Sequence, residues 1–200
     1  MIGRSLERYL LPFWHYVRCA DPMDPKDEID GIRRAQADPR SFAPLYEQYF
    51  ADVFRFVLRR TGDRERTADL TQQTFLKAML ALPKYEFRGT PFRAWLYRIA
   101  LNELRMHWRK RKEVVIEMSF AEVRGLGEEM GAEIEDERMQ HLSRALDRLP
   151  SGKARLIELR FMDGLSFAEM GVVLEIGEDA AKMRTHRVLG LLRSMMTTRG

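Results

Sequence analysis

The stretch from Asp63 to Lys112 constrains the fold of this chain more than any other part of its 200-residue sequence. In its first half, apolar side chains recur at helical spacing, which predicts a helix with one buried face. The residues of that face are Leu70, Thr74, Phe75, Met79 and Leu82. Pro83 ends this helix, because proline cannot continue the ladder of backbone hydrogen bonds.

A second helix is predicted after a short loop that is rich in aromatic and basic residues. Thr90 is a suitable N-cap, and Pro91 fits the first helical position. The buried stripe of this helix is predicted to contain Trp95, Leu96, Ile99 and Leu104. The helix leads through Trp108 into four consecutive cations at positions 109–112. The stretch therefore predicts an all-helical domain with a cationic end.

The sequence before this stretch also favours helices. Residues 4–18 form an amphipathic pattern that Pro12 shortens or kinks, and the following DPMDPKDE is predicted to be a linker. A helix with a wide apolar stripe is predicted from about Ser41 to Arg60. Gly62 is expected at the C′ position just past the end of this helix, and Asp63 is expected to cap the next helix.

Charge is distributed unevenly along the chain. Residues 29–112 hold 18 Lys and Arg against 9 Asp and Glu, residues 113–140 hold 2 against 9, and residues 141–200 hold 10 against 7. Together with the helical pattern, this distribution predicts an N-terminal extension at 1–28, helical domains at 29–112 and 133–200, and a flexible acidic linker at 113–132. The two regions with a basic excess, 29–112 and 141–200, suggest a partner that carries phosphates, although a run of charge alone is also typical of a solvated face.

Cysteine and apolar content exclude several classes of protein. The single cysteine, Cys19, excludes an internal disulfide and is typical of a reducing cytoplasm, where we expect the protein. We expect no membrane insertion, because no apolar run approaches the roughly 20 residues that span a bilayer. His15 and Cys19 lie four residues apart, but no second pair completes a site of four metal ligands. Neither a phosphate loop nor a nucleophile motif occurs, so the sequence predicts no enzyme, cofactor or metal.

The last part of the chain has the pattern of a helix-turn-helix. Helices are predicted from about Glu133 to Leu149 and from Lys153 to Met162. Ser166 and Glu169 then form a capping box that opens a short helix up to Leu174. A longer helix follows from Glu178 towards Met196. Its polar cationic residues are Lys182, Arg184, His186 and Arg187, and its inward residues are Ala181, Val188, Leu191 and Leu192. This order favours DNA recognition over a merely solvated face.

Taken together, these motifs resemble those of bacterial sigma factors of the extracytoplasmic-function type, over about residues 41–112 and 147–196. The segment DLTQQTF at 69–75 is similar to the polymerase-binding signature of that family. The residues FRG at 87–89 and FRAWLYRIA at 92–100, followed by Asn102 and the basic tail, are similar to its promoter-melting segment. LRF at 159–161, GLSFAE at 164–169 and the cations of the last helix are similar to its promoter-reading motif.

The resemblance implies partners and site residues. It implies that the protein binds RNA polymerase core and promoter DNA, directs promoter recognition, melting and initiation, and is restrained by an anti-sigma factor. Polymerase contacts are implied for Asp69, Leu70, Gln72, Gln73 and Phe75. Contacts to single-stranded promoter DNA are expected from Phe87, Arg88, Trp95, Arg98, Asn102, Arg105, Arg109, Lys110 and Arg111, where Trp95 is equally suited to the core. Contacts to duplex DNA are expected from Lys182, Arg184, His186 and Arg187.

The chain also departs from the family pattern. Gln73 stands where an acid is usual, and the loop at 88–91 is one residue shorter than usual. Glu175 occupies a turn position that normally holds Gly or a small residue, and Gly177 replaces the usual Ser or Thr cap. The alternative is a helix-turn-helix regulator that does not bind polymerase core. The segment 63–112 argues against it, because a sensor domain does not require that pattern ahead of a cationic tail.

Overall fold

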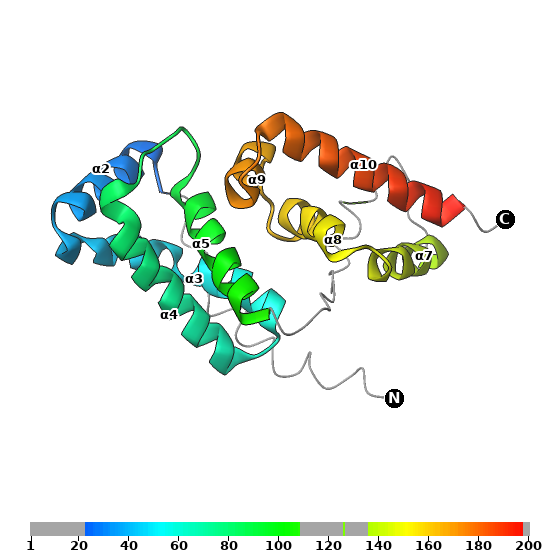
Figure 1. Cartoon of the computed structure of the whole chain (residues 1–200), viewed down its shortest axis with the longest axis horizontal. Coiled ribbons are helices and arrows are strands. Elements are labelled where there is room, and N and C mark those ends of the chain that lie inside the picture. The colour runs from blue at the N-terminus through cyan, green and yellow to red at the C-terminus, as the bar shows by residue number, and fades with distance from the viewer. Residues whose placement is uncertain (1–22, 109–125, 127–135, 198–200) are drawn as a thin grey trace. The chain divides into compact units, whose positions relative to one another are not determined.

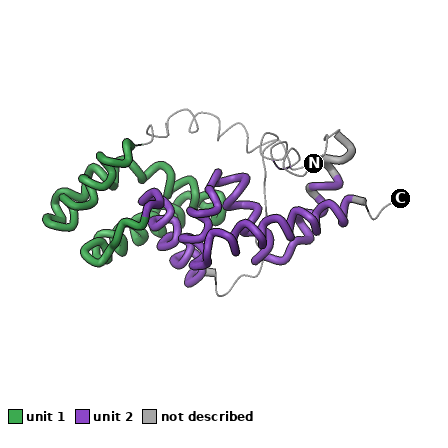
Figure 2. The backbone as a smooth tube through the Cα atoms, turned by 90° about the horizontal axis from the view of Figure 1, so that it is seen from above, with its two compact units in different colours: residues 1–88 green, residues 89–200 purple. Residues whose placement is uncertain are grey.

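The computed structural model describes residues 23–108, 126 and 136–197, and every element in these ranges is helical (Figure 1). The all-α fold class predicted from the sequence is thereby confirmed. The chain divides into two compact units, residues 1–88 and 89–200 (Figure 2). The helix predicted at 4–18, the basic run at 109–112 and, except for Leu126, the predicted linker at 113–132 lie outside the described residues. The domain boundaries given above stay predictions.

The first unit is a helical bundle that begins earlier than the sequence analysis predicted. Its elements are α2 (Pro25–Ala37), η1 (Pro39–Phe42), α3 (Ala43–Thr61), α4 (Arg64–Ala81) and η2 (Leu82–Lys84). The prediction that DPMDPKDE is a linker is wrong for its second half. Asp24 accepts a hydrogen bond from the backbone N–H of Lys26 at 2.8 Å, and Pro25 occupies the first turn. An acidic residue followed by proline often marks a turn. The same pair also occurs at the start of a helix, where the acid is the N-cap and the proline is the first helical residue.

An aromatic cluster holds α4 against α3 and η1. The ring of Phe75 on α4 lies 4.7 Å from Tyr46, 6.3 Å from Phe50 and 6.4 Å from Phe42, measured between ring centroids. Leu70 and Phe75 are buried, as their helical spacing predicted, whereas Met79 is half-buried. Aromatic pairs at such distances contribute beyond the area they bury. The aromatic cluster therefore holds α4 in place and fixes the position of its outer face.

The connection between α3 and α4 confirms two details predicted from the sequence. Gly62 has a φ of 62°, a left-handed conformation that glycine adopts without steric cost, and its N–H donates to the carbonyl of Leu58. The Asp63 carboxylate accepts from the backbone N–H of Arg66 at 3.1 Å and caps α4. The α4 helix ends at Ala81, just before Pro83 in the turn η2. Local sequence chemistry is therefore sufficient to set both ends of α4.

The second unit contains α5 (Phe92–Trp108), α7 (Asp136–Asp147), α8 (Ser151–Ile157), η3 (Glu158–Met162), α9 (Phe167–Leu174) and α10 (Glu178–Thr197). α5 begins one residue after the predicted Pro91. The helix predicted from Lys153 to Met162 is divided in two, because its last turn is a π-turn in which the N–H of Asp163 donates to the carbonyl of Glu158. Gly164, with a φ of 66°, then turns the chain.

The capping box and the helix-turn-helix predicted from the sequence are both present. Ser166 Oγ accepts from the N–H of Glu169 at 3.2 Å, and the Glu169 carboxylate accepts from the N–H of Ser166 at 2.9 Å. The N–H of Ile176 donates to the carbonyl of Gly171 at 3.0 Å and closes the turn between α9 and α10. α9 packs against both α10 and α5. The turn therefore packs α10 against the short helix α9, which is largely buried.

Candidate nucleic-acid interface

The outer face of α10 is cationic and exposed. Lys182, Arg184, His186 and Arg187 are all exposed. Ala181, Val188 and Leu192 are buried, whereas Leu191 is half-buried. Thr185 is also buried, and its hydroxyl donates to the carbonyl of Ala181 at 2.9 Å, so its hydrogen-bonding capacity is satisfied within α10. The predicted division of α10 into two faces is therefore confirmed, and its cationic face is available to phosphates or base edges.

The outer face of α4 combines polar and apolar residues. Asp69, Gln72 and Gln73 of the DLTQQTF segment are exposed, whereas Leu70 and Phe75 are buried. Two leucines that the sequence analysis did not single out, Leu76 and Leu80, are 54% and 70% exposed. Positions 69, 72, 73, 76 and 80 lie along one side of a helix with 3.6 residues per turn. The residues Asp69, Gln72, Gln73, Leu76 and Leu80 are called the α4 stripe below.

The loop after α4 exposes an aromatic ring. Phe87 is 40% exposed, and Arg88 beside it forms an exposed ion pair with Glu86 at 3.0 Å. Gly89 follows with a φ of 77°. The base of this loop is anchored, because the side-chain amide of Gln36 on α2 donates to the carbonyls of Leu82 at 3.0 Å and Tyr85 at 2.8 Å. Phe87 therefore stands on a supported loop with its ring partly in solvent.

The residues predicted on α5 divide between core and surface. Trp95 is only 7% exposed, and its ring centroid lies 5.2 Å from that of Phe92, so the structure places it in the core. Asn102 and Arg105 are exposed, and a guanidinium N–H of Arg105 donates to the side-chain oxygen of Asn102 at 3.2 Å. Arg98 is half-buried. Arg109, Lys110 and Arg111 lie outside the described residues.

An ion pair joins α5 to α9 within the second unit. Arg93 Nε donates to Glu169 Oε1 at 2.7 Å, and only 5% of the Glu169 side chain is exposed. Burial raises the pKa of Glu169, but hydrogen bonds from Arg93 and Ser166 and the charge of Arg93 outweigh it and hold the pKa below its usual value of 4.5. Because the pKa is lowered on folding, the carboxylate stabilises the fold at neutral pH, and this contribution is lost as the pH falls below 4.5.

Comparison with known proteins agrees with this geometry. Residues 45–114 match the family Sigma-70 region 2, and residues 139–192 match the family Sigma-70, region 4. The chain is 32% identical over 185 residues to the ECF RNA polymerase sigma factor BldN of Streptomyces coelicolor, across 90% of this chain and 69% of BldN. The chain belongs to the extracytoplasmic-function sigma factors of the sigma-70 family. As a member, it binds RNA polymerase core and directs promoter recognition, DNA melting and initiation.

Two further comparisons extend this result. The sigma factor is 25% identical over 166 residues to SigX of Bacillus subtilis, across 78% of this chain and 84% of SigX. Its fold is similar to that of CnrH in complex with the cytosolic domain of CnrY, with a TM-score of 0.57 and 23% identity across 86% of this chain and 99% of CnrH. The alternative of a regulator that does not bind polymerase core is not favoured. Within the described residues, no helix of the sigma factor is long and apolar enough to cross a membrane.

The turn of the helix-turn-helix contains a strained residue. Glu175 is the only non-glycine residue with a positive φ in the described part of the sigma factor, with φ 57° and ψ 44°. This left-handed conformation costs a residue with a Cβ roughly 1–2 kcal/mol. Its carboxylate oxygen also lies 3.9 Å from a guanidinium nitrogen of Arg98, with 62% of the Glu175 side chain exposed. Such an exposed pair contributes little.

We expect Glu175→Gly to stabilise the sigma factor by about 0.5–1 kcal/mol, because relief of the left-handed strain exceeds the loss of the exposed pair and the added freedom of the unfolded chain. Thermal unfolding followed by circular dichroism measures the change. Glu175→Gln is the matched control, because it removes the charge but keeps the strain, and its stability should lie within about 0.5 kcal/mol of wild type. A lower melting temperature for Glu175→Gly would contradict this account.

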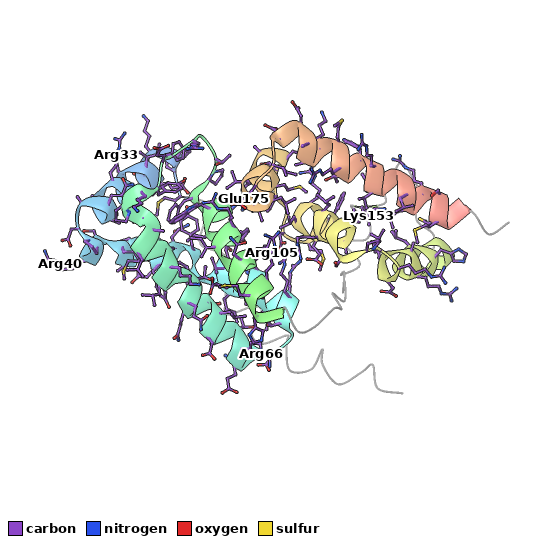
Figure 3. The ribbon with its side chains drawn as sticks, in the orientation of Figure 1. Arg33, Arg40, Arg66, Arg105, Lys153 and Glu175 are labelled. Carbon is purple, nitrogen blue, oxygen red and sulfur yellow. The ribbon has the colours of Figure 1, made fainter. Side chains whose placement is uncertain are left out.

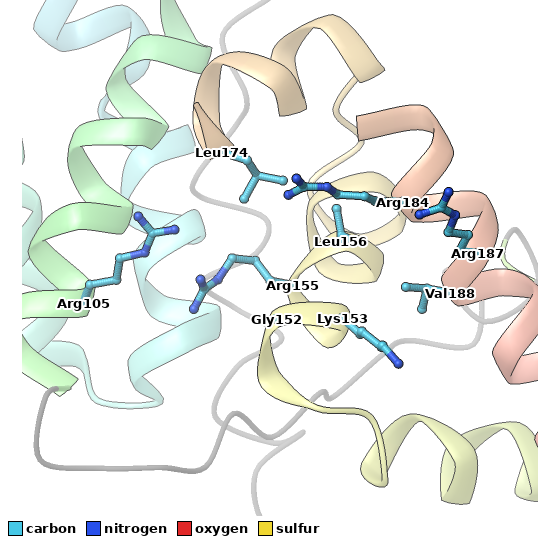
Figure 4. Close-up of a pocket in the computed structure, with 9 residues that line it drawn as sticks. All are labelled: Arg105, Gly152, Lys153, Arg155, Leu156, Leu174, Arg184, Arg187 and Val188. Carbon is cyan, nitrogen blue, oxygen red and sulfur yellow. The ribbon is translucent and has the colours of Figure 1, made fainter. Parts of the chain in front are cut away.

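A cationic pocket of about 480 Å³ lies in the second unit of the sigma factor (Figure 4). Its charged lining consists of Arg105 from α5, Lys153 and Arg155 from α8, and Arg184 and Arg187 from α10. Leu156, Leu174 and Val188 supply an apolar part. None of the described residues that line it is an acid. The positions of Arg105, Lys153 and Glu175 on the ribbon are marked in Figure 3.

Proposed function

We propose that three surfaces of this sigma factor have separate binding roles in initiation. The α4 stripe binds RNA polymerase core, Phe87 on its loop and Asn102 on α5 each contact unpaired promoter bases, and the outer face of α10 contacts the upstream promoter element as duplex. Promoter opening needs no catalytic group, because a protein that binds unpaired bases better than paired ones shifts the equilibrium towards the open form. The proposal therefore assigns the protein no enzymatic step.

The observation that carries the proposal is the exposed α4 stripe. Leu76 and Leu80 expose large apolar side chains in line with Asp69, Gln72 and Gln73, on a helix whose opposite face is packed into the aromatic cluster. An apolar patch edged by polar residues marks a surface that another protein covers. Leu70 and Phe75 serve this surface indirectly, because both are buried and position α4.

The proposed single-strand and duplex contacts rest on exposure and charge. Phe87 offers a ring on which a base can stack, and the Asn102 amide can both donate to and accept from a base edge. Trp95 contributes from the core by holding α5, and Arg88, Arg98 and Arg105 supply cations for phosphates. On α10, Lys182, Arg184, His186 and Arg187 are proposed for the duplex.

The proposal also includes a regulatory partner and a location. CnrH, which shares this fold, is known in complex with the cytosolic domain of CnrY, and we extend that to an anti-sigma factor for this chain. The α4 stripe is one surface that such a partner would cover. The protein is expected in the cytoplasm, where polymerase core and promoter DNA are found. The basic tail at 109–111 and the acidic linker are proposed to contact promoter phosphates and the polymerase channel, respectively.

We expect Gln72→Ala and Leu80→Ala each to weaken binding to purified polymerase core by roughly 5- to 30-fold, since an interface residue near the centre of a contact contributes about 1–2 kcal/mol. Asp69→Ala should act in the same direction. Affinity is measured by fluorescence anisotropy of labelled sigma factor titrated with core. Glu47→Ala, an exposed change on α3, is the control and should bind like wild type.

A loss of core affinity supports the proposal only if the variant is folded like the wild type. Leu80 is 70% exposed, so its replacement by alanine removes little buried area and should leave the melting temperature unchanged. Promoter-directed transcription by core plus each variant should fall in proportion to core affinity and recover at high sigma concentration. Unchanged core affinity in both Gln72→Ala and Leu80→Ala would remove the α4 stripe from the proposal.

A further inference from the structure

The lining of the cationic pocket in the second unit contains five basic side chains. Arg105, Lys153, Arg155, Arg184 and Arg187 come from three different helices and line one volume. Lys153, Arg184 and Arg187 are exposed, and none of the three pairs with an acid in the part of the chain that the structure describes. The positive charges of these three exposed side chains repel one another, so an anion in the pocket would stabilise their arrangement.

Three of the five cationic side chains point towards one part of the pocket (Figure 4). The guanidinium groups of Arg105, Arg155 and Arg184 extend from α5, α8 and α10 towards the same gap (Figure 4). A guanidinium group donates to phosphate oxygens through a planar fork, and two such groups can share one phosphate chain. The volume of about 480 Å³ lies within the range of small-ligand sites.

The apolar part of the pocket indicates what the phosphate chain would carry. Leu156, Leu174 and Val188 give a surface without hydrogen-bonding groups beside the cations. A flat heterocycle can lie on such a surface while its phosphates reach the guanidinium groups. Inorganic polyphosphate would use only the cationic part. The combination therefore favours a nucleotide with several phosphates.

We propose that this pocket binds a nucleoside polyphosphate, and that the bound nucleotide opposes promoter binding. The second statement rests on the proposed function, because Arg184 and Arg187 are also proposed to contact duplex DNA. A ligand that engages them in the pocket withholds them from the duplex. It also holds α5 in its packing with α9, where Arg93 and Glu169 are paired. By linkage, duplex DNA lowers the affinity for the nucleotide by the same factor.

This pocket is distinct from a simple duplex surface because two of its cations lie outside the proposed DNA contacts. Lys153 and Arg155 belong to α8, whereas the proposed duplex contacts belong to α10. Replacement of Lys153 or Arg155 therefore separates nucleotide binding from DNA binding. Arg148 is an exposed cation of the same unit that does not line the pocket, so it provides a matched loss of charge.

The test is isothermal titration of the full chain with GTP, ATP and inorganic tripolyphosphate, at constant free Mg²⁺ and constant ionic strength. We expect saturable 1:1 binding, with a nucleotide bound more tightly than tripolyphosphate. Lys153→Gln and Arg155→Gln should each weaken nucleotide binding about tenfold, the effect of one lost charge-assisted contact, whereas Arg148→Gln should bind like wild type. Equal affinities in all three variants, or no saturable binding by wild type, would overturn the proposal.

A second measurement ties the pocket to promoter binding. Anisotropy of a labelled promoter duplex is followed while the nucleotide is added, with sulfate at the same ionic strength as the reference. We expect the nucleotide to displace the duplex from wild type and Arg148→Gln at least threefold more readily than from Lys153→Gln. If Lys153→Gln weakens duplex binding without nucleotide as much as it weakens nucleotide binding, the pocket is part of the duplex surface and the proposal fails.

The two proposals fail in different ways. Loss of nucleotide binding leaves core binding and promoter-directed transcription intact, and therefore leaves the proposed function standing. Wild-type protein that binds the nucleotide but neither polymerase core nor promoter would refute the proposed function while the pocket remains a nucleotide site.

Discussion

Phe87→Ala should reduce the yield of open complexes on duplex promoter DNA by about fivefold to a hundredfold. Stacking of a base on an aromatic side chain is worth roughly 1–3 kcal/mol, and this stacking offsets part of the cost of unpairing. Phe87 is 40% exposed on a loop that Gln36 anchors, so the change should leave the fold intact. Open complexes are measured by permanganate reactivity of unpaired thymines with a saturating concentration of polymerase holoenzyme.

Matched variants separate stacking from packing. Phe87→Tyr keeps an aromatic face and should retain most of the activity, whereas Phe87→Leu keeps apolar volume without it and should resemble Phe87→Ala. On a template whose melted segment is already mismatched, Phe87→Ala should recover in part, because the cost of unpairing is then removed. Asn102→Ala, at an exposed position of α5, should lower the duplex yield as well. Wild-type yields for both alanine variants on duplex DNA would refute these two proposed contacts.

Gly171→Ala should destabilise the second unit by about 1–3 kcal/mol and weaken duplex binding with it. A Cβ at Gly171 would lie 2.9 Å from the carbonyl oxygen of Ile176, which is backbone of the turn and cannot rotate away. The turn would have to shift, at the cost typical of an overpacked core. That cost exceeds the gain of up to about 1 kcal/mol that alanine brings to a helix interior. Urea unfolding and duplex anisotropy measure the two effects.

Gly190→Ala is the matched control for this prediction. Gly190 is exposed in the interior of α10, and nothing lies within 4 Å of the Cβ that alanine would add. The same substitution there should therefore stabilise the protein by about 0.5–1 kcal/mol through helix propensity alone. Gly171→Ala as stable as Gly190→Ala would mean that the turn tolerates a side chain and that the close approach is unimportant.

Much of the fold could be predicted because the deciding interactions are local. The end of α3 at Gly62, the cap at Asp63 and the capping box of Ser166 and Glu169 each depend on residues within a few positions of one another. The two faces of α10 follow from helical period alone. The start of α2 was not predicted because Asp24 followed by Pro25 is compatible with both a turn and a helix N-terminus. The helix that follows shows that the pair is a helix N-terminus.

The sequence alone determined the helical class, most helix ends and the exposed cations of α10, because period and caps act within one or two turns. Only the tertiary structure decided which apolar residues are left uncovered. Leu76 and Phe75 are neighbours on α4, yet one is exposed and the other is the centre of an aromatic cluster. The pairing of Arg93 with Glu169, 76 residues apart, has no periodic signal either. Contacts between distant residues depend on which helices pack together. The packing of the helices depends on the sequence of the whole chain and not on any local pattern.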